Sequence, residues 1–171
     1  LKEDGLYNNK TGARVRALGV VHVFGNMADM PRLLDIARRY KLILIEDATE
    51  ALGTRYTAGP LAGKAAGTMG DIGCYSFNGN KIMTTGAGGF VVSNHADWAE
   101  HAKHLSTQAK ADMLQFLHDE VGYNYRMTNL QAALGLAQME QLEGFIARKN
   151  TMYARYFAAL DGQRASARRK Y

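Results

Sequence analysis

The hydrophobic positions of this chain alternate between short unbroken runs and longer periodic stretches. Residues 15–24 and 42–45 are almost wholly apolar, as expected of buried strands. Between them, over residues 29–40, apolar side chains recur at the spacing of one helix face. Asp29 is placed to cap that helix, and Pro31 is tolerated in its first turn. Strand, helix and strand in this order predict a βαβ unit within a parallel sheet.

The same pattern continues downstream with weaker signals. Five glycines make residues 52–71 a predicted loop, and residues 72–77 and 90–93 are predicted as a third and a fourth strand. We expect a helix over 97–106 and irregular or mixed structure over 107–127. Thr128 and Gln131 have the spacing of a capping box. That box opens a long helical pattern that reaches about residue 160, with a kink expected near Gly144.

Composition narrows the class of protein. The 171 residues are 47% hydrophobic, enough to bury one core, and no apolar run approaches the roughly 20 residues that span a bilayer. The single cysteine, Cys74, cannot form an internal disulfide, which indicates a reducing compartment, the cytoplasm.

Four of the 21 basic residues lie in the last eight positions, leaving 17 basic against 16 acidic residues in the rest of the chain. This basic tail could contact a nucleic acid, but its charge is better explained by a chain end exposed to solvent.

The sequence at both ends of the chain predicts that the chain is incomplete. It starts at Leu1 instead of methionine, and the polar residues that follow hold only a predicted turn over 7–12. Residues 161–171 lack the periodicity of the preceding helix. We therefore expect residues 1–160 to be part of one catalytic domain and residues 161–171 to be a separate basic tail.

The most unusual stretch surrounds Lys81. An apolar strand ends at Ser76, Lys81 follows five positions later, and a glycine cluster begins at Gly86. Surface lysines usually lie on polar helix faces. Burial of an amine favours its neutral form, which attacks carbonyl groups, so we expect Lys81 to carry a Schiff base.

Other chemistries fit the sequence less well. The glycines at 86, 88 and 89 lack the third glycine of a dinucleotide-binding loop, and the segment ending at Lys64 is one residue short of a P-loop. Ser76 lacks the flanking glycines of a hydrolase elbow. Asp97, His101 and His104 could share a helix face and bind a metal, but their charged neighbours favour an exposed face, and no metal is expected.

Asp47 has two open interpretations. An acid directly after four aliphatic residues is commonly a cap or turn residue. It also lies where ligands bind in open α/β sheets, beyond the carboxyl end of a strand. Pyridoxal phosphate needs both a lysine and a carboxylate that keeps its pyridine nitrogen protonated, which Lys81 and Asp47 would supply.

Five motifs occur in order along the chain. They are Ile45-Glu46-Asp47-Ala48-Thr49-Glu50-Ala51, Gly70-Asp71-Ile72-Gly73-Cys74-Tyr75-Ser76-Phe77, Asn80-Lys81, Gly86-Ala87-Gly88-Gly89 and Gly122-Tyr123-Asn124-Tyr125-Arg126. Together they resemble one known family, the DegT-type nucleotide-sugar aminotransferases. The resemblance covers roughly residues 15–160. Residues 76–81 look most like members that act on nucleotide-linked 4-keto-6-deoxy sugars, of the bacillosamine or legionaminic acid type. The lysine at 81 argues against the related sugar dehydratases, which carry histidine there.

The resemblance implies an α/β fold, the central part of the large domain of a fold-type I aminotransferase. A mixed, mostly parallel sheet flanked by helices and a long C-terminal helix are expected. Lys81 would be the Schiff-base lysine, Asp47 the partner of the pyridinium nitrogen, and Glu50 would lie near the O3′ side of the ring. Ser76 would contact the cofactor phosphate, and Asn124 would reach the phosphate of a neighbouring subunit in a homodimer with shared active sites.

The activity implied is transfer of an amino group from glutamate to a 4-keto nucleotide-linked deoxysugar. Departures from the family pattern suggest an alternative. An upstream phosphate-binding segment, a ring-stacking aromatic residue and the small C-terminal domain are not recognisable in this sequence. The alternative is therefore an inactive fragment that keeps only the fold and the surface for dimer association.

Overall fold

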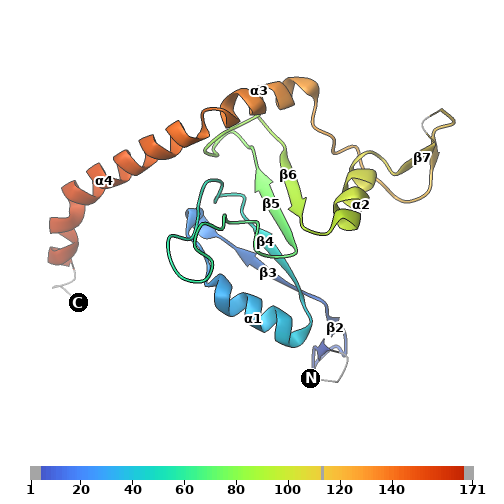
Figure 1. The fold of residues 1–171 in the computed structure, drawn as a ribbon, viewed down its shortest axis with the longest axis horizontal. Helices are drawn as coiled ribbons and strands as arrows, with labels where there is room; N and C mark the ends of the chain where they lie inside the picture. The colour runs from blue at the N-terminus through green and yellow to red at the C-terminus, as the bar shows by residue number, and fades with distance from the viewer. Residues whose placement is uncertain (1–4, 113, 168–171) are drawn as a thin grey trace.

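The computed structural model describes residues 5–112 and 114–167, with side chains described as far as residue 160. A four-stranded sheet forms its centre (Figure 1). The sheet strands are β3 (Ala17–Val21), β4 (Ile43–Asp47), β5 (Ile72–Ser76) and β6 (Gly89–Ser93). The α-helices are α1 (Met30–Tyr40), α2 (Ala96–Ser106), α3 (Asn129–Met139) and α4 (Leu142–Ala167). The short elements are β1 (Leu6–Tyr7), β2 (Arg14–Val15), η1 (Val23–Gly25), β7 (Lys110–Asp112) and β8 (Leu117–His118).

The sheet confirms the predicted βαβ unit. Its strands lie in the order β3-β4-β5-β6; β3, β4 and β5 are parallel, and β6 is antiparallel to β5. Asp47, the last residue of β4, pairs with Val21 of β3 and with Cys74 of β5. The three parallel strands therefore end at one edge, where the predicted site residues follow. The fold is the mixed, mostly parallel α/β arrangement that was expected.

Successive residues of β4 face opposite sides of the sheet, as strand geometry requires. On one side, α1 packs against the strands through a buried cluster of Met30, Ala37 and Leu44. The predicted loop over 52–71 covers the same side farther along, against buried Tyr75. The side that carries Asp47 is more open, since the exposed side chain of Val21 lies on it. The sheet thus presents one packed face and one accessible face.

Both predicted helix starts are confirmed. The Asp29 side chain accepts a hydrogen bond from the amide of Arg32 at 3.3 Å, and Thr128 accepts one from the amide of Gln131 at 3.3 Å. The Gln131 side chain accepts in turn from the Thr128 amide, which completes the capping box. The turn expected near the start of the chain is also present, as the connection between β1 and β2.

The prediction of a single buried strand over residues 15–24 is wrong. Strand β3 ends at Val21, and the chain enters the 3-10 turn η1, in which Phe24 has a φ of 52°. The cause is His22: its buried ring binds Glu46 and accepts from the amide of Ala28, which pulls the chain away from the strand direction. Val21 and Phe24 are exposed, so the apolar run does not mark burial here.

The predicted long C-terminal helix is confirmed by the 26 residues of α4, but the kink expected near Gly144 is wrong. Two helices are present, separated at residues 140–141, and Gly144 lies inside α4. The amide of Gln141 bonds the carbonyl oxygen of Gln138, three residues back, which is a 3-10 type turn. The Gln141 side chain donates to the carbonyl of Ala137 at 3.0 Å and satisfies an acceptor at the end of α3. Figure 1 shows α4 extending away from the sheet.

The segment predicted as irregular or mixed, 107–127, contains the small β7–β8 hairpin. At the other end of the chain, α4 continues to Ala167, so no helix end marks residue 160, and the division there remains a prediction. The side chains of the basic tail lie outside the described residues. Within the described part of the chain, no helix combines the length and the apolar character needed to cross a membrane.

Candidate active site

Lys81 lies in the loop that connects β5 to β6. Its amide donates to the carbonyl of Asn78 at 3.1 Å, which forms a tight turn just beyond the end of β5. A residue outside the loop also holds it in place: Gln138 of α3 hydrogen-bonds both the amide and the carbonyl of Thr84. The amide of Thr84 donates to Gln138 at 3.0 Å, and the Gln138 side chain donates back to the Thr84 carbonyl at 2.6 Å. Sequence reasoning did not identify Gln138, because nothing in a helical pattern indicates a distant loop partner.

The Lys81 side chain is directed toward Glu50. Its amine lies 3.8 Å from one carboxylate oxygen, and only 16% of the side chain is exposed. The other Glu50 oxygen accepts a hydrogen bond from the amide of Phe24 at 2.8 Å. Glu50 therefore joins the turn that follows β3 to the loop that follows β5. The structure brings together two of the predicted site residues, Lys81 and Glu50.

Asp47 ends β4 on the accessible face of the sheet. One of its oxygens accepts from the amide of Thr49 at 3.1 Å, which is the turn-forming role left open by the sequence. Asp47 also faces Cys74, its register partner on β5. Burial raises the pKa of the Cys74 thiol, and the Asp47 carboxylate raises it further. The second Asp47 oxygen has no hydrogen-bond donor among the described residues, so it is available to a ligand.

Ser76 and Asn124 occupy different surroundings. Ser76 ends β5 on the same side of the sheet as Cys74, and its hydroxyl oxygen accepts from the amide of Asn78 at 3.3 Å. The hydroxyl proton remains available to a ligand. Asn124 is exposed and pairs with Thr107 in an isolated antiparallel bridge. Among the described residues, no hydrogen bond joins Asn124 to Lys81, Asp47, Glu50 or Ser76.

A buried network lies behind Asp47, and sequence reasoning missed it. Glu46 and His22 are fully buried, and the His22 Nε2 lies 2.9 Å from a Glu46 oxygen. The amide of Ala28 donates to His22 Nδ1, so Nε2 carries the proton and donates to the carboxylate. Glu46 also accepts from three backbone amides, those of Gly67 (2.8 Å), Met69 (2.6 Å) and Gly70. This carboxylate ties the loop over 52–71 to the strand that ends in Asp47.

A cavity of about 760 Å³ opens beside Cys74. Strand β6, helix α2 and the segment 123–127 form its other walls. It carries two basic side chains, Lys103 and Arg126, and three tyrosines, of which Tyr123 and Tyr125 stack their rings with centroids 5.1 Å apart. A basic and aromatic lining of this kind suits an anionic ligand that bears a planar ring.

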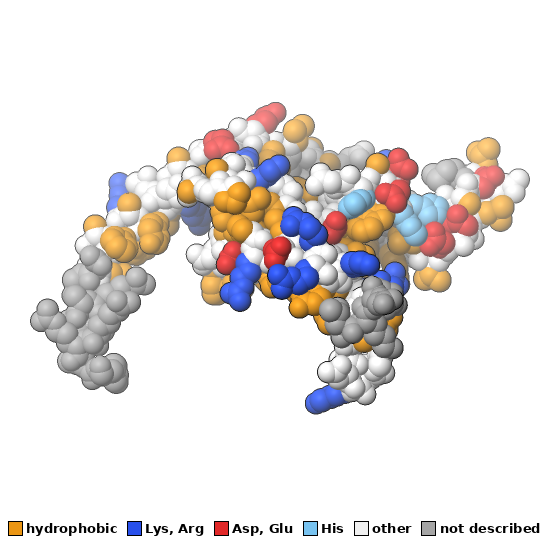
Figure 2. Space-filling view, turned by 60° about the horizontal axis from the view of Figure 1, so that its bottom comes forward, with side chains coloured by type: hydrophobic (Ala, Val, Ile, Leu, Met, Phe, Trp, Pro, Cys, Tyr) orange, Lys and Arg blue, Asp and Glu red, His pale blue; other side chains and the backbone are white. Residues whose placement is uncertain are grey.

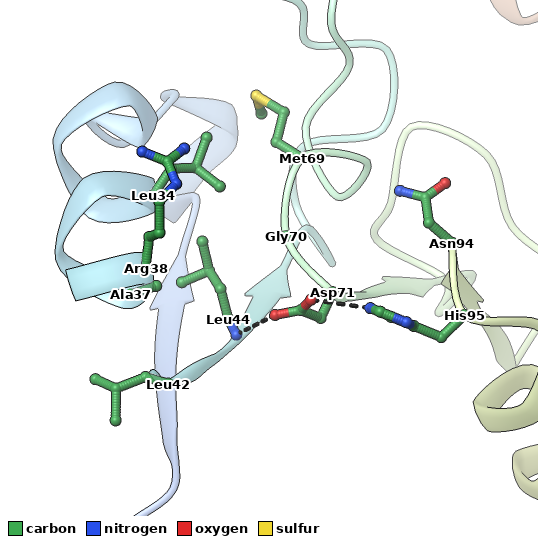
Figure 3. A pocket seen from close by; sticks show the side chains of 10 residues that line it. All are labelled: Leu34, Ala37, Arg38, Leu42, Leu44, Met69, Gly70, Asp71, Asn94 and His95. Carbon is green, nitrogen blue, oxygen red and sulfur yellow. Dashed lines mark hydrogen bonds and ion pairs between the residues drawn. The ribbon is translucent and has the colours of Figure 1, made fainter. Parts of the chain in front are cut away.

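A second, smaller cavity of about 330 Å³ lies at the opposite edge of the sheet (Figure 3). Figure 3 shows Asp71 between the backbone of Leu44 and the ring of His95. Asp71 accepts from the Leu44 amide at 2.7 Å and lies 3.0 Å from His95 Nε2. Both Asp71 oxygens are thus engaged in holding β4, β5 and the start of α2 together. This cavity is near the beginnings of the parallel strands and carries no predicted site residue.

The residues at the carboxyl edge fit the needs of pyridoxal phosphate. A partly buried amine, a carboxylate with a free oxygen and a hydroxyl follow β4 and β5 at this edge. These are the groups required to attach the aldehyde, to keep the ring nitrogen protonated and to contact the phosphate. The arrangement matches that cofactor better than a metal or a dinucleotide.

Known proteins with similar sequences lead to the same chemistry. The model of the DegT/DnrJ/EryC1/StrS aminotransferase family matches residues 8–169. GDP-perosamine synthase of Escherichia coli O157:H7 is 45% identical over 80% of this chain and 36% of its own length. The putative pyridoxal phosphate-dependent aminotransferase EpsN of Bacillus subtilis is 39% identical over 88% of this chain and 38% of its own. The chain therefore spans less than half the length of these curated relatives.

Solved structures confirm the fold class as fold-type I. The aminotransferase of Psychrobacter cryohalolentis superposes with a TM-score of 0.80 at 28% identity, over 90% of this chain and 40% of that one. DesV of S. venezuelae gives a TM-score of 0.78 at 32% identity, over 87% of this chain and 38% of that one. The cofactor that these comparisons indicate is pyridoxal phosphate. The chain belongs to the DegT/DnrJ/EryC1/StrS aminotransferase family.

Proposed function

We propose that the protein to which this chain belongs transfers an amino group from glutamate to a 4-keto, nucleotide-linked deoxysugar. The observation that carries the proposal is the position of Lys81, held beside Glu50 at the edge where β4 ends in Asp47. When bound, pyridoxal phosphate supplies an aldehyde that exchanges amino groups and a ring that withdraws electrons from the carbon undergoing deprotonation. The chain supplies the groups that hold this cofactor and move protons.

Each site residue has a task in this proposal. Lys81 attaches the cofactor and moves the proton at the reacting carbon. Asp47 uses its free oxygen to hold the protonated ring nitrogen, with its other oxygen fixed by the Thr49 amide. Glu50 positions the Lys81 amine. With the cofactor bound, it would lie near the O3′ side of the ring, as the family resemblance implies. Ser76 donates its hydroxyl proton to the phosphate, and its oxygen is kept in place by Asn78.

We assign Asn124 to a second subunit. It lies outside the group formed by Lys81 and Glu50, on an exposed segment that flanks the cavity beside Cys74. An exposed amide without a described partner within its own site is free to reach a cofactor phosphate in a neighbouring copy. A homodimer with shared active sites follows from this proposal. The separate proposal that the enzyme is cytoplasmic rests on the single cysteine of the sequence, Cys74.

The cavity beside Cys74 supports the choice of a nucleotide-linked substrate. Lys103 and Arg126 can pair with a diphosphate, and the stacked rings of Tyr123 and Tyr125 offer a surface for a base. Two curated relatives fit this class, and one of them, reported above, is named GDP-perosamine synthase. Another relative, from Campylobacter jejuni, is named UDP-4-amino-4,6-dideoxy-N-acetyl-beta-L-altrosamine transaminase and is 32% identical over 86% of this chain.

Cofactor attachment can be tested with the 171-residue chain. The chain is mixed with pyridoxal phosphate, and the visible absorbance of a lysine-bound cofactor is followed after free cofactor has been removed. Lys81→Arg should abolish the retained absorbance because arginine cannot form the linkage. The matched control, Lys64→Arg, changes an exposed lysine of the 52–71 loop and should retain it. Equal retention by both variants would contradict the assignment of Lys81.

A second candidate function is association without catalysis. The observation that favours it is the row of exposed apolar side chains on the two C-terminal helices, among them Leu136 on α3 and Tyr153 and Phe157 on α4. A chain that self-associates in sedimentation experiments but retains no cofactor absorbance would favour this candidate. A chain that retains cofactor through Lys81 would argue against it.

A further inference from the structure

Helix α2 and the end of the β7–β8 hairpin bring two histidines and two acids together. His104 Nε2 lies 2.6 Å from an oxygen of Asp119, and His101 Nε2 lies 3.1 Å from an oxygen of Glu120. The ligand atoms of His104, Asp119 and Glu120 all lie within 4.8 Å of one another. Figure 2 shows histidine and acidic side chains adjoining at this part of the surface.

We propose that His101, His104, Asp119 and Glu120 form a binding site for a divalent transition metal of the zinc class. In the sequence, Asp97 is the acid that could share a helix face with the two histidines, and no metal is expected there. The structure supplies the acids from a different segment. Asp119 and Glu120 are consecutive residues that follow β8 and meet the helix from the side.

The two histidines are suitably spaced for one ion. They stand three residues apart on α2, so both rings lie on one helix face about one turn apart. In each histidine the Nε2 atom faces a carboxylate oxygen, and the two carboxylates belong to the neighbouring residues Asp119 and Glu120. Two unrelated surface pairs would not require their acids to be adjacent in the sequence.

The backbone holds this arrangement independently of the four side chains. The Asp119 amide donates to the carbonyl of Ala109 at 3.2 Å, and the Tyr123 amide donates to the carbonyl of Leu105 at 2.7 Å. A third bond runs from the Gln108 amide to the Tyr123 carbonyl at 3.0 Å. The segment 119–123 is therefore anchored along the end of α2, and a bound ion would meet a partly preformed site.

The donor set selects the class of metal. Two imidazole nitrogens and two carboxylates suit zinc, cobalt or nickel, whereas calcium and magnesium prefer oxygen ligands alone. Metal–ligand bonds of about 2.0 to 2.2 Å place tetrahedral ligand atoms about 3.4 Å apart. The separations within the two pairs, 2.6 and 3.1 Å, are shorter than that value, and His101 lies outside the group of three whose ligand atoms are within 4.8 Å of one another. Binding would therefore require side-chain rotations that separate the paired atoms and bring the His101 ring toward the ion. All four side chains are at least 28% exposed, which leaves room for those rotations and a path for the ion.

Metal binding would cross-link the β7–β8 hairpin to α2. The segment just after Glu120 continues into Tyr123 and Tyr125, which line the large cavity together with Lys103 of α2. Four protein ligands leave no open position on the ion, which indicates a structural role rather than a catalytic one. The ion would hold this wall of the cavity in place.

The test uses the tag-free 171-residue chain, stripped with EDTA and dialysed against cobalt chloride. We expect one cobalt ion per chain, with the visible absorption of a four-coordinate ion. The double variant His101→Ala/His104→Ala should bind cobalt at least tenfold more weakly. The matched control is His95→Gln, which alters another histidine–carboxylate pair that involves no second histidine. It should bind cobalt like the unmodified chain.

The milder variants Asp119→Asn and Glu120→Gln cover the case in which the double variant fails to fold. Each should keep its helical circular dichroism and lose cobalt affinity, and zinc should raise the melting temperature of the unmodified chain more than that of either variant. Stoichiometric cobalt binding that survives in the double variant would overturn the proposal. Absence of cobalt binding by the unmodified chain would overturn it as well.

Discussion

The amine of Lys81 lies 3.8 Å from a carboxylate oxygen of Glu50, and the other oxygen of that carboxylate holds the amide of Phe24. One acid thereby links the loop that carries the proposed cofactor lysine to the turn that follows β3. The two segments reach the same edge of the sheet because their strands are parallel. The position of Lys81 thus depends on both the sheet topology and a single side chain.

Replacing Glu50 should separate its two contacts. Glu50→Gln keeps an oxygen that can accept from Phe24 but loses the charge beside Lys81, so the free energy of unfolding should change by less than about 0.5 kcal/mol. Cofactor attachment should slow by about two- to fivefold, as expected for a partly exposed ion pair. Glu50→Ala should lose both contacts and about 1 to 2 kcal/mol of stability. Urea unfolding measures the change in stability, and the rise of the cofactor absorbance measures the rate of attachment. Equal losses of stability in Glu50→Gln and Glu50→Ala would contradict the separate roles of the two Glu50 oxygens.

Cys74 reports on the electrostatic role of Asp47. Because burial and Asp47 both raise the pKa of the thiol, little thiolate is present near neutral pH, and alkylation of Cys74 should be slow. Asp47→Asn removes one of these causes, so the pKa should fall and the rate with iodoacetamide at pH 8 should rise by about two- to threefold. Asp35→Asn, on the exposed side of α1, is the control and should leave the rate unchanged.

The raised pKa of Cys74 also predicts how stability depends on pH. A thiol whose folded-state pKa lies above its unfolded value favours folding fully below the unfolded pKa, and this contribution is lost as the pH rises through the folded value. Cys74→Ala should therefore flatten the decline of unfolding free energy on the alkaline side. A decline of equal slope in the variant would show that other groups cause it.

The buried carboxylate of Glu46 should be essential for stability. Both Glu46 oxygens accept hydrogen bonds, and Glu46→Gln replaces one of them with an amide NH2 group, which is a donor. In either orientation this group would face another donor, either the backbone amides of the 67–70 turn or the N–H of His22. We expect a loss of about 3 kcal/mol, since a buried donor would be left without an acceptor. Denaturant unfolding followed by circular dichroism measures it. Glu143→Gln, at the start of α4, is the control and should change the stability by less than about 0.5 kcal/mol.

Two glycines should respond in opposite directions to alanine. A Cβ at Gly73 would lie 1.8 Å from the carbonyl oxygen of Gly67, so Gly73→Ala must displace the 52–71 loop from β5 and should cost about 3 kcal/mol or more. A Cβ at Gly144 meets nothing within 4 Å inside α4. Gly144→Ala should therefore stabilise the chain by up to about 1 kcal/mol. Thermal unfolding of both variants tests the pair.

The elements that could be predicted from the sequence are those specified by local patterns. The strand–helix–strand start, the Asp29 cap and the capping box at Thr128 all depend on residues close in the chain, and all are confirmed. The end of β3 could not be predicted this way. It depends on the contact of His22 with Glu46, which lies 24 residues farther along the chain.

The candidate site shows the same limit. The motifs around Asp47 and Lys81 indicate which residues carry chemistry, but not the contact between Lys81 and Glu50 or the support from Gln138. The break between α3 and α4 was missed because glutamine is an ordinary helix residue, and its side-chain bond to Ala137 is invisible in a hydrophobic pattern. The two acids near His101 and His104 were likewise missed because they come from a separate segment.

The most direct test of the account is chemical trapping of the cofactor. The chain is incubated with pyridoxal phosphate, reduced with borohydride, digested and analysed by mass spectrometry to locate the modified lysine. The account predicts that the label lies predominantly on Lys81 and disappears in Lys81→Arg. A label spread over exposed lysines such as Lys64, or one that persists in Lys81→Arg, would contradict it.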